Sequence, residues 1–113
     1  RLTRLLGYGK AAEMVLSGEM ISATEAHRIG LINHIYSAEE LESKTLKLAQ
    51  QIGSKSAHTL KAAKQVLRSA LDTSLTEGIL TEREVFCSLF DSADKEIGVQ
   101  AFLNRESPLW KGE

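Results

Sequence analysis

The sequence predicts a predominantly α-helical fold. Starts of the form Ser-x-x-Glu recur along the chain, and Ser-x-x-Glu is a helix N-terminal signature. Apolar residues recur at helical spacing over much of its length. Proline, which ends helices, occurs only at Pro108. No linker, low-complexity tract or internal repeat interrupts the pattern. We therefore expect about six helices and a little extended structure.

The first helix is expected between two glycines. Gly7 or Gly9 opens it and Gly18 ends it, after a helical or turn lead-in at the start of the chain. Its opening Gly-Tyr-Gly-Lys sequence is not a phosphate-binding loop. Such a loop needs a preceding strand and a hydroxyl residue after the lysine, where this chain has Ala11. We therefore expect Lys10 to be a solvated side chain.

The second helix is expected behind a capping box. The Ser22 hydroxyl can accept from the third helical N–H, and the Glu25 carboxylate can reach back to the start of the helix. Gly30 ends this helix, because glycine reaches the left-handed conformation without a Cβ clash. The segment 31–36 has apolar residues on both faces and predicts a short strand. A short extended pair is therefore expected near residues 19–36.

Helices continue to the end of the chain. They are expected over about 38–52, from 54–56 onward, after the capping box of Ser74 and Glu77, and after 91–94. The helix after Ser74 is apolar around much of its C-terminal end. We therefore expect it to be buried from two sides.

The composition is that of a soluble globular chain. Hydrophobic residues make up 42% and charged residues 26%. The apolar runs are far shorter than the roughly 20 residues that span a bilayer. The net charge of −1 includes no basic block for nucleic acid. A single cysteine excludes an internal disulfide and fits a reducing compartment. The sequence thus favours a soluble intracellular protein, cytoplasmic or alternatively of the mitochondrial matrix, without membrane or nucleic-acid partners.

No residue type falls in a catalytic or metal-binding pattern. The histidines do not lie at a metal-ligand spacing; they are His27, His34 and His58. Cys87 has apolar neighbours in sequence, which favours a buried and unreactive thiol. Glu82 and Glu84 lie two apart on a helix and so face different directions. We expect no metal site and assign no catalytic residue.

Two ordered motifs cover residues 7–33. The first reads Gly-x-x-Lys-Ala-x-Glu-x-x-Leu-x-Gly and ends at Gly18, and the second reads Ile-Ser-Ala-x-Glu-Ala-x-x-x-Gly-Leu-Ile-Asn. Together they resemble the enoyl-CoA hydratase/isomerase, or crotonase, superfamily. The resemblance implies that the chain is the helical C-terminal trimerisation and lid region of a crotonase-type α/β spiral fold. Residues 1–36 would end the core, and 37–113 would form the oligomerisation and lid region.

The resemblance also implies that the chain is part of a longer protein. In the family, Arg-Leu at the position of Arg1 and Leu2 follows a Gly-Gly-Thr-Gln segment. The family's catalytic glutamates belong to segments before this point, and no glutamate here matches them. The catalytic half is therefore expected to lie outside this chain, and the chain alone is expected to be inactive.

The segment from Asp94 to Arg105 resembles the family's closing motif. The resemblance implies that Phe102 contacts the adenine of coenzyme A and that Arg105 contacts its phosphates, for which a guanidinium is well shaped. Glu106 stands where the family usually has a basic residue, and Lys111 could compensate for it. The alternative is that Phe102 belongs to the core and Arg105 is merely solvated.

The resemblance implies an acyl-CoA enzyme, above all a 2-enoyl-CoA hydratase of fatty-acid or amino-acid catabolism. A coenzyme A thioester would be the substrate, no further cofactor is implied, and the protein would form a homotrimer or hexamer. Trp110 is then expected to pack on another subunit. Two alternatives remain open: an enoyl-CoA isomerase or other crotonase chemistry, because one fold hosts many reactions, and a non-catalytic helical module for self-association.

Overall fold

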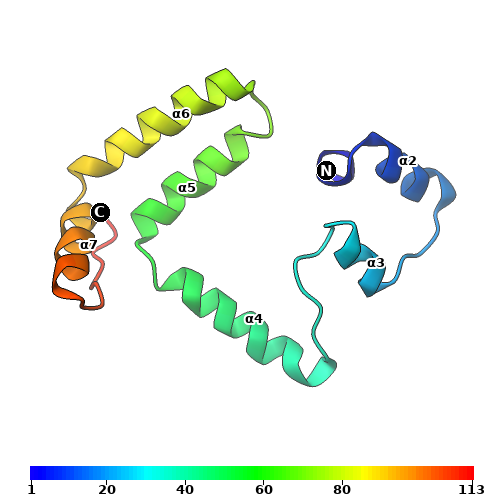
Figure 1. Ribbon diagram of the computed structural model, residues 1–113, viewed down its shortest axis with the longest axis horizontal. Coiled ribbons are helices and arrows are strands. Elements are labelled where there is room, and N and C mark those ends of the chain that lie inside the picture. Colours follow the sequence, from blue (N-terminus) through cyan, green and yellow to red (C-terminus); the bar gives the residue numbers. More distant parts are fainter. The chain divides into compact units, whose positions relative to one another are not determined.

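The computed structural model describes residues 1–113, which form seven α-helices and one 3₁₀ helix (Figure 1). The prediction of a predominantly helical chain is confirmed. The chain divides into two compact units, Arg1–Lys47 and Leu48–Glu113, and α4 (Ala38–Gly53) contributes to both. We call them the N-terminal and C-terminal units.

The N-terminal unit contains three short helices before α4. They are α1 (Leu2–Leu6), α2 (Tyr8–Ser17) and α3 (Ala23–Arg28). Gly7 separates α1 from α2 with a φ of 77°, and Gly18 ends α2 in the left-handed conformation, as predicted. Both positions need a positive φ that residues with a Cβ adopt only at a cost.

The end of α3 is also the predicted one. Gly30 has a φ of 78° and donates its N–H to the carbonyl of His27, and Leu31 donates to Ala26 at 2.9 Å. These two bonds form a Schellman motif, which satisfies carbonyls left free at the helix end.

The predicted strand over 31–36 does not form. That segment is a bend followed by irregular backbone, and the chain contains no strand at all. A strand needs a neighbouring strand to pair its N–H and C=O groups. The sequence pattern of 31–36 could not show that these 113 residues contain no partner strand. The prediction of a short extended pair near 19–36 is therefore wrong, because no strands pair there.

The C-terminal unit is a helical hairpin followed by a last helix and a tail. Its elements are α5 (Ala57–Ser69), α6 (Leu75–Ser88), η1 (Leu89–Asp91) and α7 (Ala93–Asn104). In Figure 1, α5 and α6 run side by side in opposite directions, and the C-terminus lies beside α7. Residues 106–113, here called the tail, have no regular structure.

The predicted capping boxes form to different degrees. Ser74 and Glu77 make the complete box, and the bonds from Ser74 lower the pKa of Glu77. Ser22 accepts from the N–H of Glu25 at 3.1 Å, but the Glu25 carboxylate turns to Arg28 instead of reaching back. The hydroxyl halves of these boxes are therefore confirmed, while the carboxylate half depends on competing partners.

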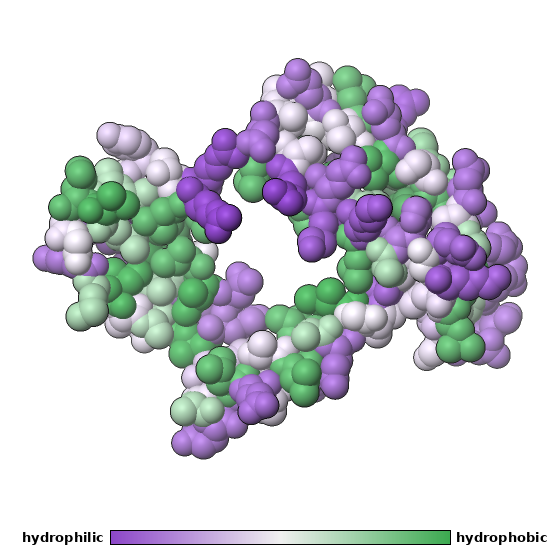
Figure 2. All heavy atoms as spheres, turned by 180° about the vertical axis from the view of Figure 1, so that it is seen from behind, coloured by the Kyte–Doolittle hydropathy of each residue, from purple (hydrophilic) through white to green (hydrophobic).

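Few apolar side chains are buried within this chain. The buried apolar residues are all alanines: Ala11, Ala26 and Ala101. The accessible surface is 9431 Å², whereas even two separate compact domains of these sizes would together expose about 7,400 Å². Figure 2 shows apolar residues in broad patches on the visible face. The helices are thus amphipathic, but their apolar faces are only partly covered.

The last turns of α6 illustrate this exposure. We expected α6 to be buried from two sides, yet it has no buried residue. Phe86 on α6 and Phe90 in the following η1 are each more than half exposed. Their rings contact each other edge to face at 5.2 Å. Within the chain, α6 packs mainly on α5 and η1. The expectation is wrong for these 113 residues because the second apolar side has no partner among them.

Candidate functional site

The C-terminal end of α7 carries two exposed residues three positions apart, Phe102 and Arg105. Phe102 is 83% exposed, so the interpretation of Phe102 as a core residue does not hold in this chain. Arg105, also exposed, follows the last helical residue and donates its N–H to the Phe102 carbonyl at 3.3 Å. Both predicted residues therefore lie at the surface, at the same end of α7.

Arg105 has an unusual backbone conformation. It is the one non-glycine residue with a positive φ, 57°, and it ends α7 in the left-handed region. Glu106 completes the helix end by donating its N–H to Ala101 at 2.8 Å. For a residue with a Cβ, this conformation is about 1–2 kcal/mol less favourable than the right-handed one. The chain thus keeps a cation where glycine would be the less strained choice.

Lys111 lies at the other end of the same helix. After Glu106 the chain turns back, and the N–H of Lys111 donates to the Asp94 carboxylate in the first turn of α7 at 2.7 Å. Asp94 and Arg105 are separated by about 16 Å along the helix at 1.5 Å per residue. The structure therefore brings Phe102 and Arg105 together but places the backbone of Lys111 at the opposite end of α7.

Asp94 is the centre of the polar contacts in the C-terminal unit. It is only 1% exposed, and its carboxylate accepts from the Ser56 hydroxyl and from the N–H groups of Lys111 and Gly112. Its own N–H donates to the Glu113 carbonyl at 3.0 Å. The Ser56 hydroxyl above all, and then the two tail N–H groups, hold the pKa of Asp94 below its usual value against the opposing effect of burial.

No local sequence pattern indicates this role of Asp94. Asp94 was interpreted only as part of the start of the last helix and as the first residue of a family motif. Its partners lie 17, 18 and 38 residues away. Local spacing cannot reveal such partners. The one available signal is that Asp94 has no explanation of its own, whereas the other residues at the start of that helix have one.

Trp110 packs within its own chain. Its indole N–H donates to the carbonyl of Ser54 at 2.8 Å. Its ring also lies against Gly98 on α7, where an added Cβ would come within 3.1 Å of a ring carbon. These contacts leave the ring half-buried, and its packing on another subunit stays a prediction.

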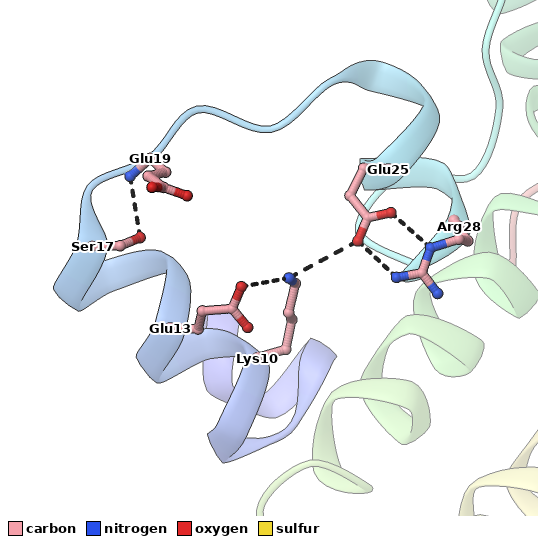
Figure 3. A network of polar contacts seen from close by, with 6 residues as sticks. All are labelled: Lys10, Glu13, Ser17, Glu19, Glu25 and Arg28. Carbon is pink, nitrogen blue, oxygen red and sulfur yellow. Dashed lines mark hydrogen bonds and ion pairs between the residues drawn. The ribbon is translucent and has the colours of Figure 1, made fainter.

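A second polar network belongs to the N-terminal unit (Figure 3). Lys10 on α2 pairs with Glu13 at 3.0 Å and lies 3.9 Å from Glu25 on α3. Glu25 also accepts two bonds from the Arg28 guanidinium, both at 2.7 Å. Lys10 is therefore an ion-pair partner rather than a simply solvated side chain.

The charges in this network stabilise one another. The hydrogen bonds from Arg28 lower the pKa of Glu25, and those same bonds raise the pKa of Arg28. Glu25 thus has a cation on both sides and is held in its charged form. A carboxylate with these partners ties α2 to α3 and is poorly suited to take up a proton at neutral pH.

The remaining candidates stay apart. No three His, Cys, Asp or Glu side chains converge in a way that could hold a metal ion. The His34 ring lies beside the ring of Tyr36, with 5.7 Å between the ring centroids. Cys87 is exposed, which corrects the prediction of a buried thiol, because α5 and η1 leave that part of α6 uncovered. None of the helices has the length and apolar character needed to cross a membrane.

An apolar groove lies between α5 and α6, with a volume of about 350 Å³. Its walls include Val66 and Leu67 on α5 and Val85 and Phe86 on α6. Glu82 is the one ionisable side chain among its lining residues. The groove offers apolar contact but no converging catalytic groups.

Curated proteins of similar sequence include several enoyl-CoA hydratases. The chain is 37% identical over 110 residues to a probable mitochondrial enoyl-CoA hydratase of Dictyostelium discoideum, which spans 97% of this chain and 40% of that protein. It is also 37% identical over 112 residues to the 2,3-dehydroadipyl-CoA hydratase of Escherichia coli, spanning 99% of this chain and 44% of that protein. The chain thus spans less than half the length of these relatives.

Solved structures agree with the sequence comparison. An enoyl-CoA hydratase from Bacillus anthracis superposes with a TM-score of 0.95 at 31% identity, over 99% of this chain and 43% of that one. One from Geobacillus kaustophilus superposes with a TM-score of 0.91 at 35% identity, over 99% of this chain and 44% of that one. The helical arrangement is therefore that of a portion of these proteins.

The family comparison covers every residue. The sequence profile of the enoyl-CoA hydratase/isomerase family matches residues 1–113. This confirms the resemblance carried by the two N-terminal motifs and by the closing motif around α7. The chain belongs to the enoyl-CoA hydratase/isomerase family.

Proposed function

We propose that this chain is the helical C-terminal part of a 2-enoyl-CoA hydratase. The observation that carries the proposal is the 37% identity to the E. coli 2,3-dehydroadipyl-CoA hydratase across 99% of the chain. The relatives named above are all called hydratases. A coenzyme A thioester would be the substrate, and no other cofactor is proposed. The protein would work as a homotrimer or hexamer in the cytoplasm or the mitochondrial matrix.

In this proposal the chain supplies binding groups rather than reacting groups. Hydration of an enoyl thioester needs donors that polarise its carbonyl and carboxylates that deliver water. The carboxylates with clear functions here are already engaged: Glu25 with two cations, Glu77 in its capping box, and Asp94 with the tail. We therefore assign no catalytic residue in this chain and expect it to be inactive alone.

Phe102 and Arg105 are proposed to bind coenzyme A. The exposed Phe102 ring offers a flat surface on which an adenine can stack. The neighbouring Arg105 guanidinium can form paired hydrogen bonds with a phosphate. Lys111 is proposed as a further cation for the same ligand, reaching it from the other end of α7.

A chimera tests this proposal. The segment of the E. coli 2,3-dehydroadipyl-CoA hydratase that matches this chain is replaced by residues 1–113. We expect the chimera to hydrate crotonyl-CoA and the 113-residue chain alone to show no turnover. Phe102→Ala and Arg105→Ala in the chimera should raise KM with little change in kcat, because they remove ground-state binding. Leu103→Ala, at an exposed neighbouring position, is the matched control.

Three results would contradict parts of the proposal. A chimera that assembles and moves the substrate double bond without adding water would support the isomerase alternative. Normal KM values for both the Phe102 and Arg105 variants would remove these residues from the binding site. Turnover by the isolated chain would show that the reacting groups lie within it.

The non-catalytic alternative is supported by the exposed apolar faces. Large side chains on α6, η1 and α7 are uncovered, among them Phe86, Phe90 and Leu103. Contiguous apolar surface of this kind marks interaction sites. Sedimentation of the isolated chain separates the cases: self-association without affinity for coenzyme A favours the alternative, and affinity for coenzyme A favours the binding role.

A further inference from the structure

The tail is held by one buried carboxylate. Both Asp94 oxygens are used: one accepts from Lys111 at 2.7 Å, and the other accepts from the Ser56 hydroxyl and from Gly112 at 3.0 Å. The Asp94 N–H returns a bond to Glu113. Three separate segments, the start of α5, the start of α7 and the tail, therefore meet at a single side chain.

Capping of α7 does not account for Asp94. That helix already has an N-cap in Ser92, whose hydroxyl accepts from the Lys95 N–H at 3.1 Å. Ser56 likewise caps α5 by accepting from Thr59 while it donates to Asp94. Taking a carboxylate out of water is costly unless its oxygens are hydrogen-bonded. Here the donors that repay this cost come mostly from distant segments.

Trp110 provides a second anchor for the same tail. It donates to the Ser54 carbonyl just before α5, and its ring fills the space over Gly98 on α7. Gly112 adopts a φ of 85°. A Cβ added to Gly112 would lie 4.0 Å from the Cβ of Ala57. The tail is thus fixed on both sides of Lys111, whose side chain remains exposed.

We propose that Asp94 is a latch that docks residues 110–113 on the first turns of α5 and α7 and thereby positions Lys111 for a phosphate-bearing ligand. Asp94 is a positioning residue that acts through the Lys111 backbone. The part that concerns the ligand rests on the coenzyme A binding proposed above. Docking of the tail does not depend on that function.

Tail docking can be measured directly, because Trp110 is the only tryptophan. In Asp94→Asn, the new amide N–H₂ meets the Ser56 hydroxyl or the tail N–H groups, which are donors themselves. We expect the Trp110 emission to shift to the red and its quenching by iodide to rise, with the far-UV circular dichroism retained. An unchanged emission in a folded variant would overturn the latch.

Two variants control for indirect effects. Ser92→Ala removes the cap of α7 without touching the tail, and Asp91→Asn removes an exposed carboxylate one turn away. Both should keep the emission of the unaltered chain. A red shift in Ser92→Ala equal to that of Asp94→Asn would mean that any loosening of α7 frees the tail, and the latch would be rejected.

Hydrogen exchange of the unaltered chain tests the latch even if Asp94→Asn does not fold. The Lys111 and Gly112 amides should exchange as slowly as amides inside α7, because both donate to a buried carboxylate. Exchange of these two amides at the rate of free peptide would overturn the proposal.

Affinity for coenzyme A tests the positioning of Lys111. Removing the negative charge of Asp94 should by itself strengthen the binding of an anion. The latch predicts the opposite. In the chimera, Asp94→Asn should bind coenzyme A several-fold more weakly, to about the same extent as Lys111→Ala. The double variant should lose no further affinity. Tighter binding in Asp94→Asn would overturn the positioning role. If the unaltered chimera binds no coenzyme A, the proposed function fails, while emission and exchange still decide the latch.

Discussion

The two units of this chain use charged side chains in opposite ways. In the N-terminal unit, Lys10, Glu25 and Arg28 form ion pairs at the surface between α2 and α3. In the C-terminal unit, Asp94 is buried, and neutral donors from two other segments, the start of α5 and the tail, satisfy it. Exposed pairs are weak and screened by salt, whereas a buried carboxylate is costly to disturb. We therefore expect Asp94 alone to contribute more to the stability of the fold than the whole surface network.

The largest effect is expected from Asp94→Ala. This change leaves the Ser56 hydroxyl and the tail N–H groups without their acceptor and releases the segments that meet there. The thermal midpoint of the C-terminal unit, followed by Trp110 emission, should fall much further than the midpoint measured for Glu25→Ala by circular dichroism. Equal losses in the two variants would contradict the contrast between the units.

Gly98→Ala should cost about 1–3 kcal/mol in the free energy of unfolding. Its Cβ would come within 3.1 Å of the Trp110 ring and push the tail away from α7. Gly78→Ala is the matched control, because the nearest atom to its Cβ is the Thr73 hydroxyl at 3.6 Å, an ordinary contact. That variant should gain about 0.5–1 kcal/mol from helix propensity. Urea unfolding of both variants checks the difference in sign.

Arg105→Gly should raise stability by about 1 kcal/mol, because glycine adopts the left-handed conformation at the end of α7 without strain. In the chimera, the same change should weaken coenzyme A binding through the loss of the guanidinium. Arg105→Lys should keep the strain and part of the affinity. Urea unfolding and calorimetric titration measure the two effects. A loss of stability in Arg105→Gly would mean that the side chain has a structural role.

Salt should produce the smallest difference between the two units, whereas acid should weaken both. The pKa values of Glu25 and Asp94 are both lowered by folding, from 4.5 and 3.8. Their contributions to stability are therefore complete above these unfolded values and disappear as the pH falls through the lower folded ones. At neutral pH, raising the salt from 0.1 M to 1 M should weaken the Glu25 network and leave Trp110 emission unchanged. A salt-dependent emission would contradict the buried character of Asp94.

Much of the local structure could be predicted from the sequence. Ser56, Ser74 and Ser92 start helices as expected, and Gly18 and Gly30 end them, since caps and left-handed glycines act within a few residues. The family followed from the order of two motifs. The location of Phe102 and Arg105 beside each other also followed, because one helix end carries both.

The failures all concern contacts between distant segments. The segment 31–36 had the pattern of a strand but finds no partner strand, and Cys87 had apolar neighbours in sequence but no cover in space. The hydrogen bond from Trp110 to Ser54, 56 residues away, was not predicted either. An apolar pattern shows which residues avoid water, but it does not show which surface covers them.

By itself, the sequence determined the helices, their ends and the family of this protein, because these depend on interactions between residues close along the chain. Only the tertiary structure decided the role of Asp94, the separation of Lys111 from Arg105, and the strained backbone at Arg105. A buried carboxylate is stable only where donors converge on it in space. That convergence depends on how α5, α7 and the tail pack together, which residue spacing does not encode.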